Sequence, residues 1–349
     1  MSSEFPLRRI LAIAAVATAA VLAGCAEPAP PPAPVAVAPP PPPSVILSAR
    51  LIDQAAVYRA YVDRAALVSP AFTDGASVAQ GLKTAESYEP HQLLRGAIAY
   101  GAVVALQDPG FRAGVRTYVV DADQRRTVAY EIMKDPAYVL GIKGSADAAG
   151  LVISALGDDG RKLYGDGVAV KQAAYDVQHA AWSKADVVGR EGRLALAKQV
   201  SATPLTSESD LSSKLSQAVS GTQPLTLAAS SSSPPYTPLV IRSLAVAALA
   251  ALGYADDDSL GQVIPIMAEP NADQCLNMSK LNLYQCLAVA KPHYEDVFCL
   301  GQHVLKDTGA CLMKGVGLAE PVPPPPAALP VTQVSTTPHT ARHGRKHKD

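Results

Sequence analysis

Four cysteines near the C-terminal end restrict the fold of this chain more than any other feature. Cys275 and Cys286 lie eleven residues apart in a segment whose apolar residues recur with helical spacing, and Cys299 and Cys311 follow a break at Lys291-Pro292. Eleven residues rotate a helix by about 20° beyond three turns, so the first two cysteines share one face. In an antiparallel helical pair that turns at this break, the two inner cysteines are equidistant from the turn, and so are the two outer ones. The spacing predicts a helical hairpin with nested disulfides, Cys275–Cys311 and Cys286–Cys299.

Other pairings fit this geometry less well. A bond between Cys275 and Cys286 would require the intervening helix to be broken, because eleven helical residues span about 16 Å, beyond disulfide reach. The outer bond, Cys275–Cys311, requires the second helix to end before Cys311. Cys299 and Cys311 are twelve residues apart, so on a continuous helix they would point in different directions. We therefore expect Gly309 to end the second helix and to let Cys311 reach across.

A zinc site is a competing interpretation of the same cysteines, because His293 and His303 lie close by. Zinc sites usually place two cysteines about two to four residues apart, and the smallest spacing here is eleven. The arrangement is also similar to the paired-cysteine hairpins of coiled-coil–helix domains, although the spacings differ. We therefore favour disulfides and predict neither a metal ion nor another cofactor.

The first 25 residues indicate the compartment in which these thiols would oxidise. Arg8 and Arg9 precede an apolar run over residues 10–22, which is shorter than the roughly 20 residues needed to span a bilayer. A basic start followed by a short apolar run is typical of a secretory signal peptide, which we assign to residues 1–24. An exported chain reaches an oxidising compartment, where disulfides form and persist.

The leader ends in Leu22-Ala23-Gly24-Cys25, which resembles the lipobox of bacterial lipoprotein precursors. The resemblance implies cleavage before Cys25, a diacylglyceryl group on its sulfur and a fatty acyl chain such as palmitate on its new amino group. Two or more acyl chains anchor a protein stably where one is marginal. Ala26 follows in place of the Asp that favours inner-membrane retention in enterobacterial lipoproteins, which resembles outer-membrane sorting toward the periplasm. The alternative is a secreted protein with an incidental cysteine.

Composition divides the mature chain into five segments. The first is a Pro-rich linker whose polyproline II conformation, at about 3.1 Å per residue, would hold the next segment on the order of 50 Å from the membrane. The segments are the lipidated linker (25–44), an N-terminal helical part (45–200), a Ser/Pro-rich loop or linker (201–235), a C-terminal helical part with the four cysteines (236–317), and a disordered Pro-rich and basic tail (318–349). Within the Ser/Pro-rich segment we expect one short helix around residues 211–219.

The apolar residues favour helices over strands. Hydrophobic residues make up 48% of the chain but aromatic residues only 5%, so Ala, Val and Leu predominate, and Ala and Leu are strong helix formers. Pro90 precedes an apolar run, and Asp108-Pro109 and Asp135-Pro136 are typical of helix starts. No alternating strand pattern occurs. The sequence predicts an all-α fold: a multi-helix bundle or irregular helical array with a disulfide-stapled C-terminal hairpin and disordered termini.

Clustered glycines suggest interruptions in the long segment after Ser145. Gly and Asp residues cluster at positions 157–160 and 165–167, and glycine is unfavourable inside helices. We therefore expect breaks there, with nearby aspartates acting as helix caps: Asp158, Asp159 and Asp166.

The best candidate for a polar site is a cluster of four residues: Tyr175, Asp176, His179 and Trp182. Asp176 and His179 are three residues apart, so they could share one helix face and cooperate in metal or acid–base chemistry. Trp182, the only tryptophan, could stack on a sugar. The simpler alternative is a helix whose Trp packs against the core while its Asp and His are solvated.

The remaining features favour binding over catalysis. The net charge of −1 argues against a nucleic-acid binder. Motifs for phosphate binding, for a hydrolase serine or for a zinc helix do not occur. We expect a lipid-anchored envelope protein with a structural or interaction role, contacting envelope proteins and, through its basic tail, peptidoglycan. The alternatives are a peptidoglycan-acting enzyme tethered to the outer membrane and a small-ligand carrier, and whether the chain is an enzyme at all stays open.

Overall fold

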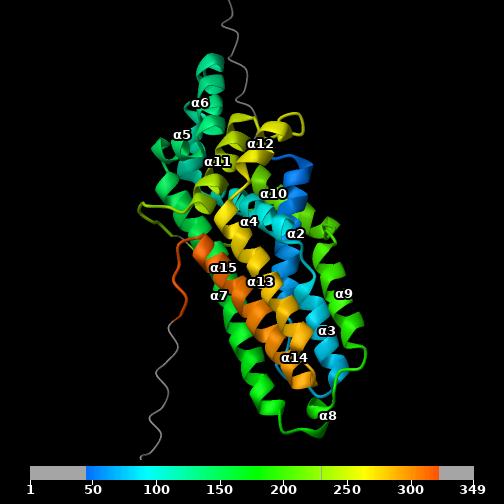
Figure 1. The fold of residues 1–349 in the computed structure, drawn as a ribbon. Coiled ribbons are helices and arrows are strands. Elements are labelled where there is room, and N and C mark those ends of the chain that lie inside the picture. The colour runs from blue at the N-terminus through cyan, green and yellow to red at the C-terminus, as the bar shows by residue number, and fades with distance from the viewer. Residues whose placement is uncertain (1–44, 229, 322–349) are drawn as a thin grey trace, which may run out of the picture. The chain divides into compact units, whose positions relative to one another are not determined.

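The computed structural model describes residues 45–228 and 230–321. The signal peptide, Cys25, the Pro-rich linker and the tail from residue 322 lie outside these residues. The described residues fold into helices joined by loops (Figure 1). They contain no strand, only an isolated bridge between Asp186 and Pro292. The predicted all-α class is confirmed.

The helices follow one another through both described ranges with few long loops. In chain order they are α2 (Ala49–Ala65), α3 (Gly75–Glu86), α4 (Pro90–Ala105), α5 (Pro109–Arg116), α6 (Ala122–Lys134), the 3-10 helix η1 (Pro136–Gly141), α7 (Ser145–Val177), α8 (Ala181–Lys184), α9 (Arg190–Ala202), α10 (Ser209–Ser220), α11 (Pro238–Leu252), α12 (Leu260–Ile266), α13 (Pro270–Val289), α14 (His293–Cys299), the π-helical segment η2 (Leu300–Lys306) and α15 (Asp307–Gly315).

Side-chain caps explain where several helices begin. The Glu89 carboxylate accepts hydrogen bonds from two first-turn amides of α4, at 3.0 and 2.6 Å, and Pro90 occupies the first helical position. Asp108 accepts one from the amide of Phe111 at the start of α5, at 2.5 Å. Asp135 does the same for η1, at 3.0 Å. The Asp-Pro pairs therefore mark helix starts as predicted. The aspartate carboxylate accepts a hydrogen bond from a first-turn amide, which has no carbonyl partner within the helix.

One hydrophobic core draws on both helical parts of the chain. The α4 and α11 helices are buried on nearly all sides, and α4 packs against α2, α7 and α11. Buried residues from 45–200 and from 236–317 belong to the same cluster. The two helical parts predicted from composition therefore form a single body.

The Ser/Pro-rich segment between these parts is attached to the body. It contains α10, which confirms the short helix expected there, and α10 buries Leu215, Ala218 and Val219. The side-chain amide of Gln92 donates to the carbonyl oxygen of Leu205 at 2.7 Å and accepts from its backbone amide at 2.8 Å. A single side chain thus satisfies both backbone groups of a loop residue.

The breaks predicted in the long glycine-containing segment were wrong. The α7 helix runs without interruption through residues 157–160 and 165–167. The three aspartates predicted as caps are therefore interior helical residues: Asp158, Asp159 and Asp166. Tertiary packing overrides the low helix propensity of glycine here, because the missing side chains leave room for another helix.

That helix is the rod formed by α14, η2 and α15. A Cβ added to Gly160 would lie 2.9 Å from the carbonyl oxygen of Gly309, and one added to Gly167 would lie 2.8 Å from that of Gly301. Each of these glycines thus faces a glycine on the other helix. The two backbones approach closely along most of their shared length, as small residues permit.

The disulfides follow the nested scheme. Cys275 is bonded to Cys311 and Cys286 to Cys299, with both Cα–Cα distances at 5.7 Å. The first bond joins α13 to α15, and the second joins α13 to α14 nearer the turn. Pro292 lies in this turn between α13 and α14. The hairpin geometry derived from the sequence is confirmed.

The expectation that Gly309 ends the second helix was wrong. The rod continues from α14 through η2 to Gly315. A π-helical turn inserts one extra residue into the helical phase, so the twelve residues from Cys299 to Cys311 rotate about as far as eleven ordinary ones. Eleven is the spacing on the partner helix, and this matching lets both cysteine pairs meet. Gly309 contributes the close approach to α7 instead.

Candidate functional site

The four residues predicted as a polar cluster do not form one site. The α7 helix ends at Val177, so Asp176 and His179 do not share a helix face. Asp176 is exposed and accepts a hydrogen bond from Gln172 at 3.0 Å. His179 lines a shallow pocket near the following loop. Trp182 lies in α8 beside His293, with ring centroids 6.4 Å apart.

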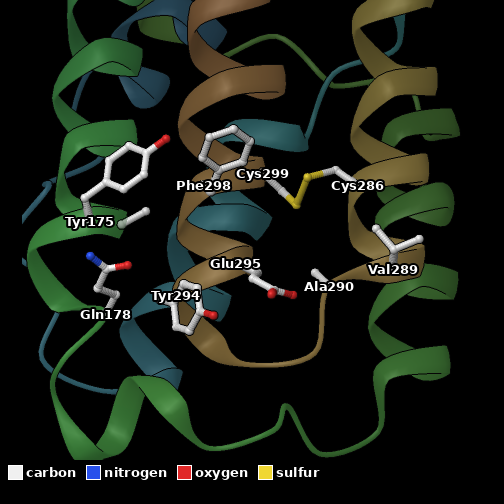
Figure 2. A pocket seen from close by; sticks show the side chains of 10 residues that line it. Tyr175, Gln178, Cys286, Val289, Ala290, Tyr294, Glu295, Phe298 and Cys299 are labelled. Carbon is white, nitrogen blue, oxygen red and sulfur yellow. A yellow bond between two sulfur atoms is a disulfide. The ribbon is translucent and has the colours of Figure 1, made fainter.

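Tyr175, the fourth of them, lines an apolar groove of about 380 Å³ where α7, α13 and α14 meet. Figure 2 shows Tyr175 and Gln178 on the α7 side, Val289 and Ala290 on the α13 side, and α14 between them. The Tyr175 ring stands edge-on to that of Phe298, with centroids 6.4 Å apart. We call this site the aromatic groove; its lining is Ala174, Tyr175, Gln178, Cys286, Val289, Ala290, Tyr294, Glu295, Phe298 and Cys299.

The inner disulfide fixes the width of the aromatic groove. Cys286 on α13 and Cys299 on α14 both line it and are covalently joined. The opposite wall is α7, which the glycine contacts hold against the rod. Both walls are therefore constrained, and the groove is preformed.

The surface of the groove is apolar, aromatic and open to solvent. Tyr175 is 49% exposed and Val289 is 74% exposed. Glu295 is the one acidic residue in its lining, and its carboxylate accepts a hydrogen bond from the backbone amide of Lys291 at 2.8 Å. Lys171 lies beside the groove, with its ammonium 5.2 Å from the centroid of the Phe298 ring. Such a lining suits an apolar segment with few charges.

A buried charged cluster, which the sequence analysis missed, lies inside the body. The ammonium of Lys280 donates hydrogen bonds to the carbonyl oxygen of Glu86 and to the hydroxyl of Ser201, the latter at 3.0 Å. It also lies 3.5 Å from the centroid of the Tyr88 ring. These contacts join α13 to α3, to α9 and to the loop between α3 and α4. Position 280 lies on the same helix face as the apolar residues at 276, 283 and 287. A lysine on such an apolar face was the one sequence feature that could have indicated this buried charge.

Burial shifts the ionisation of this pair. It raises the pKa of the Glu86 carboxyl to about 7, and the nearby Asp296 adds to this while Lys280 opposes it. Burial also lowers the pKa of the Lys280 ammonium well below its usual value, against the attraction of Glu86. Glu86 and Lys280 are only 3% and 4% exposed, so we relate these shifts to the stability of the fold.

The α9 helix is held against α13 by arginines. Arg193 is paired with Asp296 and donates to the carbonyl oxygen of Leu287. Arg190 donates to the carbonyl oxygen of Ala290 at 2.8 Å. These arginines satisfy carbonyls at the end of α13 that no further turn can reach. Their role is to fix the end of α13 that forms one wall of the aromatic groove.

A second buried pair connects α2 to α7. Arg59 donates to both carboxylate oxygens of Asp159, at 2.7 and 2.8 Å, and the Tyr58 hydroxyl donates to one of them at 3.0 Å. Burial raises the pKa of Asp159, although Arg59 opposes this. Asp159 is therefore a packing residue of the helix, with all of its partners inside the protein.

The described residues contain neither a grouping of metal ligands nor a helix that could span a membrane. Among residues 45–228 and 230–321, no three His, Cys, Asp or Glu side chains are grouped to hold a metal ion. No helix in these ranges has the length and hydropathy that crossing a bilayer requires. All four cysteines considered for zinc are bonded in disulfides.

Comparison with known proteins adds no relative. No protein-family model, no curated protein and no solved structure matches this chain.

Proposed function

We propose that this chain is an envelope lipoprotein whose helical body, tethered to the outer membrane through Cys25, binds a protein segment in the aromatic groove. The observation that carries the binding role is the groove: an open, preformed surface of Tyr175, Tyr294, Phe298 and Val289. Aromatic residues supply large contact areas at low entropic cost and are enriched where proteins bind one another.

The disulfides support the export that the lipobox implies. Cys299 and Cys311 are buried, and both bonds bridge helices that the fold brings together. Disulfides of this kind persist in oxidising compartments and are rare in the cytosol. The spacer would then place the groove on the order of 50 Å from the membrane surface.

The geometry supports the two alternatives less well. Hydrolysis of a glycosidic bond uses two carboxyl groups facing the scissile bond, and the groove has one, Glu295, already bonded to a backbone amide. A small-ligand carrier would enclose its ligand on most sides, whereas Tyr175 and Val289 are open to solvent.

The anchor is tested by replacing Cys25→Ser. We expect the wild-type mature chain to carry the mass of its acyl groups and to enter the detergent phase, and the variant to lack this mass and to retain residues 1–24. The matched control is the double variant Cys286→Ser/Cys299→Ser, which removes two other cysteines and should keep the acyl mass. An unchanged mass and partitioning of the Cys25 variant would contradict the anchor.

The binding role is tested with a charge placed in the groove. Val289→Glu should abolish a stoichiometric crosslinked adduct between this protein and its partner in intact envelopes. Val120→Glu is the matched control, because Val120 is 91% exposed and lies between α5 and α6, outside the groove. Release of muropeptides by the purified wild-type protein would favour the enzyme alternative instead.

A further inference from the structure

The last described residues contact α7. After α15 the chain turns at Gly317, whose φ is +83°, and Leu318 packs on α7 at Gly157, where an added Cβ would lie 2.5 Å from the Leu318 side chain. Figure 1 shows this orange-red segment leaving the end of α15 on the side of α7. The described residues end at Pro321. The chain thus leaves the body on the surface of α7.

The exit point and the aromatic groove lie on one face of α7. Gly157 and Tyr175 are eighteen residues apart, which is five complete helical turns, and Tyr175 therefore lies directly in line with Gly157, about 27 Å along the helix. Val168, between them on nearly the same face, is 46% exposed. Arg161 and Gln172, about 40° and about 60° from that line, are exposed as well. An accessible strip therefore connects Leu318 to the groove.

The composition and length of the next residues match this strip. Residues 321–330 read Pro-Val-Pro-Pro-Pro-Pro-Ala-Ala-Leu-Pro, which favours an extended polyproline II conformation. At about 3.1 Å per residue, nine residues beyond Leu318 extend roughly 28 Å. The prolines would cover the strip, and the Ala-Ala-Leu-Pro end would arrive at Tyr175.

We propose that the chain's own Pro-rich segment, residues 321–330, runs along α7 and binds in the aromatic groove. Polyproline segments are recognised by grooves lined with aromatic side chains, because the extended helix is already ordered and loses little entropy on binding. Tyr175, Tyr294 and Phe298 supply such a lining. The short tether holds the segment at an effective concentration on the order of mM, so even a weak contact is populated.

This proposal rests on the groove being a peptide-binding site, as proposed above, and it adds a regulatory consequence. A partner segment would have to displace the tail from the groove. The bound tail would therefore lower the apparent affinity of the groove for the partner. The basic residues after Pro338 would then extend beyond the groove, where they remain free to contact an anionic surface.

The test uses the photoreactive amino acid p-benzoylphenylalanine at position 175 of the full-length lipoprotein in envelopes. After illumination and tryptic digestion, the peptide of residues 172–184 should be joined to that of residues 315–342. The matched control carries the same probe at Tyr138, which is 43% exposed and belongs to η1. We expect the tail crosslink to be about tenfold more abundant from position 175.

Two further measurements make the outcome specific. Mixing isotopically labelled and unlabelled chains separates a tail of the same chain from that of a second copy; crosslinks between differently labelled chains would overturn the proposal. Replacing the four consecutive prolines, Pro323 to Pro326, by Ser should reduce the crosslink several-fold, because a flexible segment loses more entropy on binding. An unchanged yield would also overturn it.

The result separates this proposal from the proposed function. A crosslink from position 175 to another envelope protein, without the tail, would leave the binding role intact and overturn the tail as occupant. A probe that joins neither the tail nor any other protein would overturn both.

Discussion

Gly160 of α7 and Gly309 of α15 face each other with their backbones in close contact. A Cβ on Gly160 would lie 2.9 Å from the Gly309 carbonyl oxygen, and one on Gly309 would lie 2.6 Å from the Gly160 carbonyl oxygen. Real Cβ atoms do not approach backbone oxygens this closely, so neither position can accept a side chain without movement of a helix. The crossing of α7 with the rod depends on this pair.

Replacing Gly160→Ala should therefore destabilise the protein by about 2 kcal/mol, because overpacking outweighs the better helix propensity of alanine. Gly165→Ala is the control on the same helix. A Cβ there meets nothing within 4 Å, so this variant should gain up to about 1 kcal/mol. Urea unfolding followed by circular dichroism measures both. Equal stabilities of the two variants would contradict the role assigned to the crossing.

Two adjacent aspartates of α7 should differ sharply in their contribution to stability. Asp159 is buried and bonded to Arg59 and Tyr58, whereas Asp158 is exposed and paired only with Arg161 on its own helix. Asp159→Ala leaves the largely buried Arg59 with only the exposed Asp63 as its partner and should cost about 3 kcal/mol. Asp158→Ala should cost less than about 1 kcal/mol. Thermal unfolding of the two variants measures the difference, and similar costs would refute the buried pair.

The buried Glu86 should make stability depend on pH. Its pKa is about 7 in the folded protein against an ordinary value of 4.5, so the folded state holds the proton more tightly than the unfolded chain. Glu86 therefore lowers stability progressively as the pH rises from about 4.5 to about 7, by up to about 3 kcal/mol. Glu86→Gln cannot ionise, and its stability relative to wild type should rise through this window and then level off. Urea titrations across the window measure it; a constant difference would count against the shift.

The two disulfides should contribute unequally. The Cys275–Cys311 bond closes a sequence separation of 36 residues and the Cys286–Cys299 bond one of 13. By loop-closure entropy these correspond to about 4 and about 3 kcal/mol. The double variant Cys275→Ser/Cys311→Ser should therefore unfold at lower urea than Cys286→Ser/Cys299→Ser. Peptide mapping without reduction checks the pairing in the wild type, and a Cys275–Cys286 peptide would disprove it.

Part of the candidate site was predictable and part was not. The cysteine spacing predicted the hairpin and its pairing, because both depend mainly on helical periodicity and on the position of the turn, whereas the π turn that aligns Cys311 was not predicted. Tyr175 was singled out, yet for a polar cluster that does not form, since nothing local indicated that α7 ends at Val177. The aromatic partners Tyr294 and Phe298 reach the groove from α14, more than one hundred residues away along the chain, and no local pattern indicates such a meeting.

The sequence by itself determined the all-α class, the helix starts at Pro90 and at the two Asp-Pro pairs, and the nested disulfides, because capping and periodicity act over a few residues. Only the tertiary structure decided that the glycines of α7 lie inside a helix, that a π turn and not Gly309 aligns Cys311, and that Lys280 and Glu86 are buried together. These outcomes depend on which surfaces meet across the core. Gly160 and Gly167 lie at contacts because another backbone occupies the space that their side chains would fill, and the sequence around each glycine does not show where that backbone lies.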